Sequence, residues 1–121
     1  MLILLSPAKS LDFDTPLPPG LAHTLPAFPA QARELVGLLR GFAPQELASL
    51  MHISDTLAAL NVARYANFRA RPGEAHARQA LLAFNGDVYD GLDAGSLDAS
   101  ALAWAQDHLA ILSGLYGVLR P

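Results

Sequence analysis

Three apolar runs along the chain predict β-strands. They cover residues 2–5, 80–84 and 109–114. The first run is followed directly by Ser6 and Pro7, and a short continuous apolar run with such an end is typical of a strand buried on both faces. Helical patterns occupy the stretches between the runs, and strands separated by helices usually pair in parallel. The pattern therefore predicts an α/β fold with a mixed, largely parallel sheet.

The helical patterns have recognisable beginnings and ends. Proline fits the first turn of a helix and glycine its end, so Pro29 and Gly41 frame the first helix. Ser54 or Asp55 can cap the third, because a short polar side chain accepts hydrogen bonds from the N–H groups of the first turn. Asp87 is expected to cap a later one. The expected helices cover about residues 29–40, 44–51 and 56–68, then a short stretch from 87 to 91, and one that starts at Ser96 or Asp98. Residues 10–29 contain five prolines and are expected to form a long loop.

Composition narrows the class of protein. The chain has 121 residues, the length of a single domain. Only 16% of them are charged, against about 25% in typical soluble domains. This scarcity of charge indicates that further sequence, or a second copy of the chain, covers part of the apolar surface. The lack of cysteine excludes disulfides and thiolate metal sites. We expect no metal, no cofactor and, with no apolar run of roughly 18 residues, no membrane; a cytoplasmic location follows.

Polar residues follow the predicted strands, where ligands bind in open α/β sheets. "SPAK" places Ser6 and Lys9 after the first strand, and a lysine there can hold an anion as a point charge. "NGDVYDGL" adds Asp87 and Tyr89 after the second. "GLYGVLRP" adds Tyr116, and Arg120 as an anion contact, after the third. The possible cleft residues are Ser6, Asp87, Tyr89 and Tyr116. The alternative is a set of ordinary strand ends with solvated side chains.

A helical hairpin is expected at "LASLMHISDTLAALNVARYANF". Its turn and second helix present Ile53, Ser54, Asp55 and Asn61, and turn amides at a helix N-terminus can meet phosphate. The glycine-hydrophobic-glycine turn of a helix-hairpin-helix is replaced here by "HIS", so an ordinary helical hairpin is an equal alternative. The core face of the second helix is either the stripe through Leu57, Leu60, Asn61, Arg64 and Phe68 or the one through Ala59, Val62, Ala63 and Ala66.

Arginines cluster after this hairpin. Four of the eight basic residues, Arg64, Arg69, Arg71 and Arg78, lie within fifteen positions that contain a single acid. Such a cluster suits phosphate recognition, although arginines at a helix end also complement the helix dipole. Aspartates at 87, 90 and 93 recur every three residues, a spacing that does not match the calcium loop.

Four segments together resemble one family. "LILLSPAKSLD", "MHISDTLAALNVARY", "AFNGDVYDGL" and "LSGLYGVLRP" occur in the order found in the YaaA peroxide-stress proteins. The resemblance implies bacterial cytosolic proteins that bind DNA, keep free iron low under hydrogen peroxide, and have a positively charged cleft and a helix-hairpin-helix, placed here at residues 47–68. Asn85 stands where the family commonly has lysine. Members continue to roughly twice this length, so this chain is expected to be the N-terminal part of one longer domain.

Two functional hypotheses follow. In the first, the chain binds double-stranded or distorted DNA and limits iron-dependent oxidative damage to it. The residues expected to contact nucleic acid are Lys9, Arg64, Arg69, Arg71 and Arg120. In the second, the chain is an enzyme, and Ser6, Lys9, Asp87, Tyr89 and Arg120 converge on a nucleotide-like small molecule. An incomplete sheet with an unpaired edge also predicts a possible homo-oligomer.

Overall fold

The computed structural model describes residues 1–121 except for the side chain of Glu74. The chain divides into two compact units. One consists of Met1–Phe28 and Pro72–Pro121, and the other of Pro29–Arg71. We call them the sheet unit and the helical unit. Whether both belong to one domain stays a prediction.

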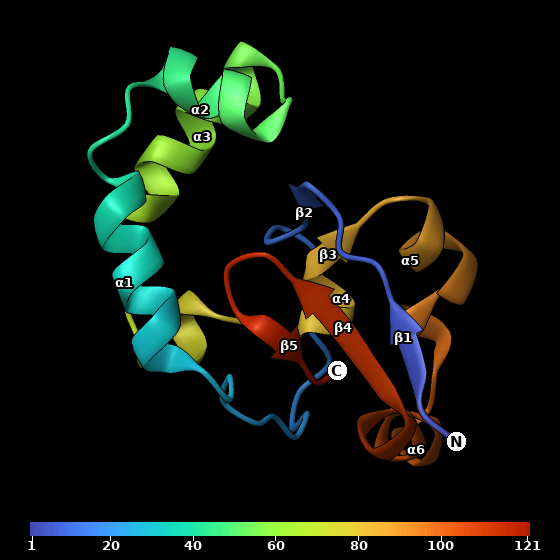
Figure 1. Ribbon diagram of the computed structural model, residues 1–121. Helices are drawn as coiled ribbons and strands as arrows, with labels where there is room; N and C mark the ends of the chain where they lie inside the picture. Colours follow the sequence, from blue (N-terminus) through green and yellow to red (C-terminus); the bar gives the residue numbers. More distant parts are fainter. The chain divides into compact units, whose positions relative to one another are not determined.

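The sheet unit is built around three strands in the order β1-β4-β5 (Figure 1). Its strands are β1 (Ile3–Leu5), β4 (Leu109–Ser113) and β5 (Gly117–Leu119). β1 and β4 are parallel, with Leu5 opposite Ile111, whereas β4 and β5 form an antiparallel hairpin with Leu119 opposite Ile111. A second, antiparallel pair joins β2 (Ser10–Leu11) to β3 (Phe84–Asn85). The prediction of a mixed α/β fold is confirmed, but β5 was not expected as a strand.

Short helices cover one face of the three-stranded sheet. They are α4 (Ala80–Ala83), α5 (Asp87–Leu92) and α6 (Ala99–His108), with single 3₁₀ turns η1 (Glu74–His76) and η2 (Ala94–Ser96). Asp98 caps α6 as expected, because its carboxylate accepts a hydrogen bond of 2.7 Å from the Ala101 N–H. The expected cap at Asp87 is wrong. Gly86 occupies the cap position and Asp87 is the first residue of α5.

The prediction of a strand over residues 80–84 is largely wrong. Residues 80–83 form α4, and only Phe84 enters a strand. A five-residue apolar run has the same composition in a buried helix turn and in a buried strand, so periodicity cannot separate them. Tertiary contacts decide: α4 buries Leu81 and Ala83.

The core of the sheet unit lies on one side of β1 and β4. Leu81, Tyr89, Ala105, Leu109 and Ile111 form its buried centre, together with Ala94. Ile3, Leu5 and Leu119 pack against this cluster from the sheet. Leu4 points the other way and is 59% exposed. The expectation that residues 2–5 are buried on both faces is therefore wrong for the chain as it stands.

The helical unit contains three helices that match the predicted ranges closely. They are α1 (Pro29–Leu39), α2 (Pro44–Met51) and α3 (Asp55–Ala66). Ser54 is the cap of α3, since its hydroxyl accepts a 3.2 Å hydrogen bond from the Leu57 N–H. The buried side chains of the unit are Ala32, Val36, Leu47, Ala58 and Tyr65.

Neither expected stripe is the core face of α3. The buried positions are Ala58 and Tyr65, seven residues apart on one side of the helix. Ala59, Ala63 and Ala66 are exposed, while Asn61 and Arg64 are half-buried beside the core face. The large phenol ring of Tyr65 has more apolar surface to bury than the small alanines of the second stripe, and the first stripe includes the polar Asn61 and Arg64.

No helix among the described residues is long and apolar enough to cross a membrane.

Candidate functional site

The "SPAK" and "NGDVY" segments lie against each other in the sheet unit. The Tyr89 hydroxyl donates a 2.6 Å hydrogen bond to the Ser6 carbonyl oxygen. The β2–β3 pairing places Ser10 opposite Asn85. Gly86 lies beside Ala8, since a Cβ added at Gly86 would be 3.5 Å from the Ala8 Cβ. Two segments about 80 residues apart in the sequence thus form one surface.

Lys9 and Asp87 belong to this surface. Both side chains are exposed at the ends of the paired segments. Tyr89 is buried, and burial raises the pKa of its phenol above the ordinary value. The ring packs against Phe84, with centroids 5.4 Å apart. Tyr89 therefore works here as an anchor for the Ser6 backbone.

Tyr116 and Arg120 leave the sheet at opposite ends of the hairpin. Tyr116 lies in the turn after β4, where its N–H donates to the Ser113 Oγ at 3.1 Å; burial raises the pKa of its phenol. Leu5 and Leu119 both flank Ile111, but β5 runs antiparallel to β1. Ser6 therefore continues towards the carboxyl end of β4, and Arg120 continues away from it. The register does not bring Arg120 to the same edge as Ser6.

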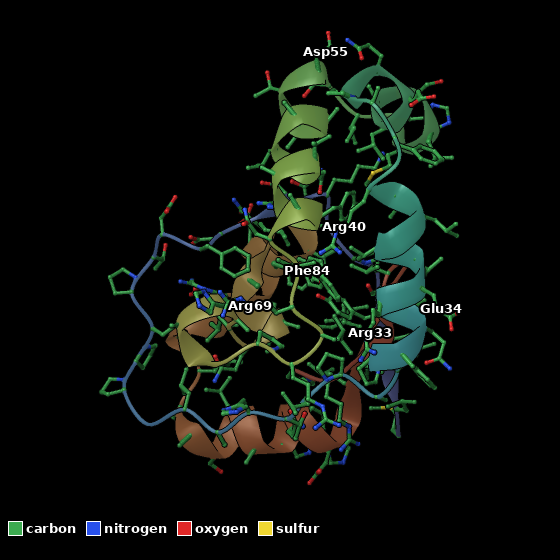
Figure 2. The ribbon with its side chains drawn as sticks, turned by 90° about the vertical axis from the view of Figure 1, so that its left-hand side faces the viewer. Arg33, Glu34, Arg40, Asp55, Arg69 and Phe84 are labelled. Atoms are coloured by element: carbon green, nitrogen blue, oxygen red, sulfur yellow. The ribbon has the colours of Figure 1, made fainter. Side chains whose placement is uncertain are left out.

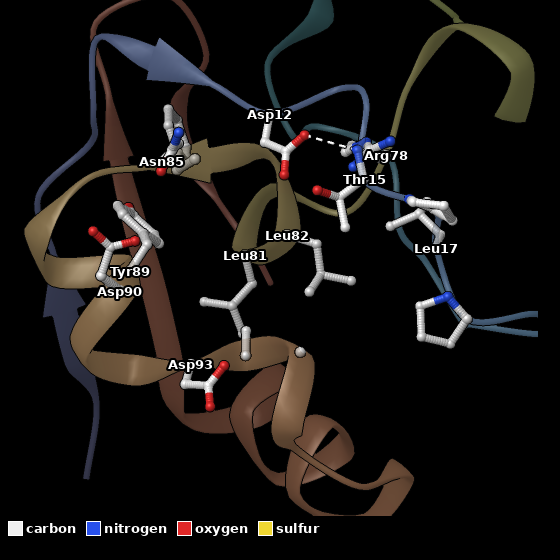
Figure 3. Close-up of a pocket in the computed structure, with 15 residues that line it drawn as sticks. Asp12, Thr15, Leu17, Arg78, Leu81, Leu82, Asn85, Tyr89, Asp90 and Asp93 are labelled. Carbon is white, nitrogen blue, oxygen red and sulfur yellow. Dashed lines mark hydrogen bonds between the residues drawn. The ribbon is translucent and has the colours of Figure 1, made fainter.

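An open groove of about 470 Å³ lies beside α4 and α5 (Figure 3). The segment from Asp12 to Pro18 forms one wall, and residues from α4 to η2 form the other. Its charged side chains are Asp12, Arg78, Asp90 and Asp93. Of the residues named in the enzyme hypothesis, only Tyr89 lines this groove. Excess negative charge disfavours a phosphate ligand there, and the nucleotide hypothesis stays a prediction without support from this groove.

Asp12 and Arg78 shape the groove wall. The Asp12 Oδ1 accepts hydrogen bonds of 2.9 Å from the N–H groups of Asp14 and Thr15. The Thr15 hydroxyl, these two N–H groups and the nearby Arg78 charge lower the pKa of Asp12 to about 2. Arg78 donates to the Phe13 carbonyl oxygen at 2.9 Å, with its guanidinium 5.4 Å from the Phe13 ring centroid. Sequence reasoning missed this pair, although "DFDT" carries the signature of a local Asp turn.

The turn of the α2–α3 hairpin uses its first amides internally. His52 adopts a left-handed conformation with φ 51°, and its N–H bonds to the Ala48 carbonyl oxygen. The Ile53 N–H donates to the same oxygen at 3.2 Å. Both amides therefore close the end of α2, as in a common helix C-terminal motif. The N-terminal turn of α3 follows, and its Ser54 and Asp55 are exposed.

Asn61 also bonds locally. Its Nδ2 donates to the Leu57 carbonyl oxygen at 2.8 Å, one turn earlier in α3. The expected arginines lie further along. Arg64 is half-buried, and desolvation lowers the pKa of its guanidinium. Arg69, labelled in Figure 2, and Arg71 follow α3, and both are exposed. The hairpin residues and three of the four clustered arginines thus lie in the helical unit, whereas Arg78 belongs to the sheet unit.

Arg40 is a structural arginine that the sequence analysis missed. Its Nε donates to the Tyr65 carbonyl oxygen at 2.8 Å, and its Nη2 donates to that of Phe68 at 3.4 Å. A cation at the C-terminus of α3 complements the negative end of the helix dipole. Arg40 therefore ties the end of α1 to the end of α3 and positions the segment that carries Arg69.

Charge is divided unevenly between the two units. Residues 29–71 contain five basic and three acidic residues, a net charge of +2 with histidine neutral. The rest of the chain contains three basic and eight acidic residues, a net charge of −5. The overall charge of −3 therefore hides a basic helical unit. Among the described residues, no group of three or more histidine, aspartate or glutamate side chains could hold a metal ion.

Comparison with known proteins gives a consistent family. The family model described as "Peroxide stress protein YaaA" matches residues 1–121. Over all 121 residues the chain is 71% identical to a UPF0246 protein of Paracidovorax citrulli and 70% identical to one of Delftia acidovorans. A UPF0246 protein of Verminephrobacter eiseniae is 60% identical over the same length. The chain covers 47%, 46% and 46% of these proteins, so it spans about half of their length.

Proposed function

Because this chain belongs to the YaaA family of peroxide stress proteins, we propose that it binds DNA through the phosphate backbone. The helical unit makes the contact, and the bound DNA is either duplex or distorted. In this proposal DNA binding serves to limit iron-dependent oxidative damage under peroxide stress. The observation that carries the proposal is the charge of the helical unit, +2 within a chain of net charge −3.

Three further features support this surface. Arg69 and Arg71 are exposed beyond the end of α3, and guanidinium groups suit phosphate oxygens because they donate in a planar fork. Arg40 already satisfies carbonyl oxygens at that end, which leaves the positive charge of the following arginines available to a ligand. The exposed N-terminal turn of α3 adds the positive end of a helix dipole, which the carboxylate of Asp55 partly offsets.

Arg64, Lys9 and Arg120 have smaller roles in this proposal. Arg64 is half-buried, so we assign it a supporting contact at the margin of the surface. Lys9 and Arg120 belong to the sheet unit, where acids outnumber bases by eight to three. The field of that unit weakens their attraction for phosphate. We therefore expect most of the affinity from the helical unit.

The test is a salt series of DNA binding. Fluorescent duplex and bulged DNA are titrated with this chain and with the double variant Arg69→Ala/Arg71→Ala. Removal of one arginine–phosphate interaction is expected to flatten the slope of log K against log salt by about 0.9. The slope of the double variant should therefore be flatter by about 2 units, equally for all sequences, because phosphate contacts carry no sequence information.

Arg33→Ala is the matched control. It removes the same kind of charge from the same unit, but Arg33 lies two helical turns before Arg40, about 10 Å along α1. A slope unchanged by Arg33→Ala and flattened by the double variant supports a local contact. Equal effects per removed charge would indicate non-specific attraction. No binding by either this chain or the full-length Paracidovorax citrulli relative would refute the proposal.

A further inference from the structure

The three-stranded sheet has one apolar face that no other described part of its unit covers. Side chains alternate along strands, so Ile3, Leu5, Ile111 and Leu119 enter the core. The alternate positions face outward. Ala110, opposite Leu4, is small and 7% exposed; the other four, Leu2, Leu4, Leu112 and Val118, are 62%, 59%, 43% and 40% exposed. We call these four residues the outer sheet face. In Figure 1 the helices α4 and α5 lie behind the strands, opposite this face.

We propose that this outer sheet face is the docking surface for the part of the family protein that this chain does not span. Strands that pair in parallel are normally covered on both faces, and β1 with β4 is such a pair. A continuous exposed apolar patch marks an interaction surface. All four side chains are hydrocarbon, so the partner surface must be apolar polypeptide. A nucleic acid finds no cation or hydrogen-bond donor among them.

The length of the relatives identifies the occupant. The match with each relative covers all of this chain but only 46–47% of the relative. More than half of each relative therefore lies outside the match. The carbonyl oxygen of Pro121 accepts a hydrogen bond from the Leu81 N–H at 3.3 Å. This bond holds Pro121 against α4, within the sheet unit.

A second copy of this chain fits the face less well. The patch consists of Leu2, just before β1, and three side chains on strands of three to five residues, whereas a stable interface between separate molecules buries about 800 Å² per partner. A covalently attached segment has a high effective concentration and so needs a smaller contact. The small area therefore favours attachment over self-association.

Single cysteines provide the test, because the chain has no natural cysteine. Leu4→Cys reports on the outer sheet face, and Leu25→Cys is the matched control, since both side chains are 59% exposed in the same unit. Each variant is made in this chain and in a chimera of this chain followed by the remainder of the Paracidovorax citrulli relative. Thiol labelling rates are corrected for the chimera without the introduced cysteine.

We expect both cysteines to label at similar rates in this chain. In the chimera, labelling of Leu4→Cys should slow by at least about tenfold at every protein concentration, while Leu25→Cys is unchanged. Equal labelling of Leu4→Cys in both proteins would overturn the proposal. Protection of Leu4→Cys that grows with protein concentration would also overturn it, because such protection indicates a second copy. Protection already present in this chain alone at low concentration would overturn it as well. A chimera without a cooperative melt counts against it as well.

Leu4→Lys gives a readout independent of labelling. In this chain the lysine stays in water, so the melting temperature should change little. In the chimera it buries a charge against apolar surface, so the melting temperature should fall clearly. Equal melting shifts in both proteins would contradict docking on this face. DNA binding by the helical unit is not involved in either readout, so the two proposals fail separately.

Discussion

Replacement of Tyr89 by phenylalanine tests the link between the two segments of the sheet-unit surface. The substitution removes one hydroxyl and keeps the ring that packs against Phe84. The hydroxyl donates to the Ser6 carbonyl oxygen at 2.6 Å, across 83 residues of sequence. No other change is expected in the core, because the ring volume is almost the same.

The magnitude follows from this single hydrogen bond. A net contribution of about 1 kcal/mol is typical for an intramolecular hydrogen bond, and the Ser6 carbonyl at the exposed end of β1 can turn to water. For 121 residues, an unfolding entropy of about 2.1 cal/mol/K per residue converts this loss to about 4 °C of melting temperature. Tyr89→Ala also loses the ring and should cost about 3 to 5 kcal/mol.

Thermal unfolding at pH 7, followed by circular dichroism, measures this difference. Tyr65→Phe is the control, because its hydroxyl has only a 3.8 Å contact to the Met51 sulfur, and it should shift the melting temperature less. No shift for Tyr89→Phe would refute the assigned role of the hydroxyl. A shift as large as that of Tyr89→Ala would show that the packing, not the bond, had changed.

The pH dependence supplies a second check on the same residue. Burial raises the pKa of Tyr89 above 10 in the folded state, so the folded state favours the neutral phenol. Its contribution is fully present below the unfolded pKa and is lost as pH rises through the folded pKa. Phenylalanine does not titrate. The stability difference between the protein and Tyr89→Phe should therefore shrink above pH 10; a difference that stays constant would contradict the pKa direction.

Three further predictions concern local structure. Gly117→Ala should destabilise the fold by about 1 to 2 kcal/mol, because φ is +73° and the new Cβ meets the Phe28 ring at 3.2 Å. Denaturant unfolding measures this loss, and Gly114→Ala is the control, since a Cβ at Gly114 would have no neighbour within 4 Å. Ser54→Ala should cost about 1 kcal/mol by loss of the α3 cap, whereas Ser54→Asp should keep most of it, again by denaturant unfolding. The Asp12 carboxyl should titrate near pH 2 by NMR; its stabilising contribution is present above about pH 4 and lost towards pH 2, and a midpoint near 4 would contradict the local turn.

The sequence by itself determined the elements that carry local signals. Pro29 starts α1, Ser54 caps α3 and Asp98 caps α6, because capping depends on a side chain and a backbone group a few residues apart. The apolar run before Ser113 gave β4. The order of the four sequence segments was enough to indicate the family, which the match over the whole chain confirms. Such local signals did not determine the contacts between residues of the candidate site.

Only the tertiary structure decided which residues meet. The Tyr89 bond to Ser6 and the Arg40 bonds to the end of α3 join positions far apart in sequence, and no local pattern encodes such a pairing. The run over 80–84 became helix because burial of Leu81, not periodicity, fixed its form. The register of the β4–β5 hairpin sent Arg120 away from Ser6. The net positive charge of the helical unit was recognised only once the structure divided the chain into two units. The field of a charged group depends on which other charges lie near it in space, and the sequence order alone does not give that.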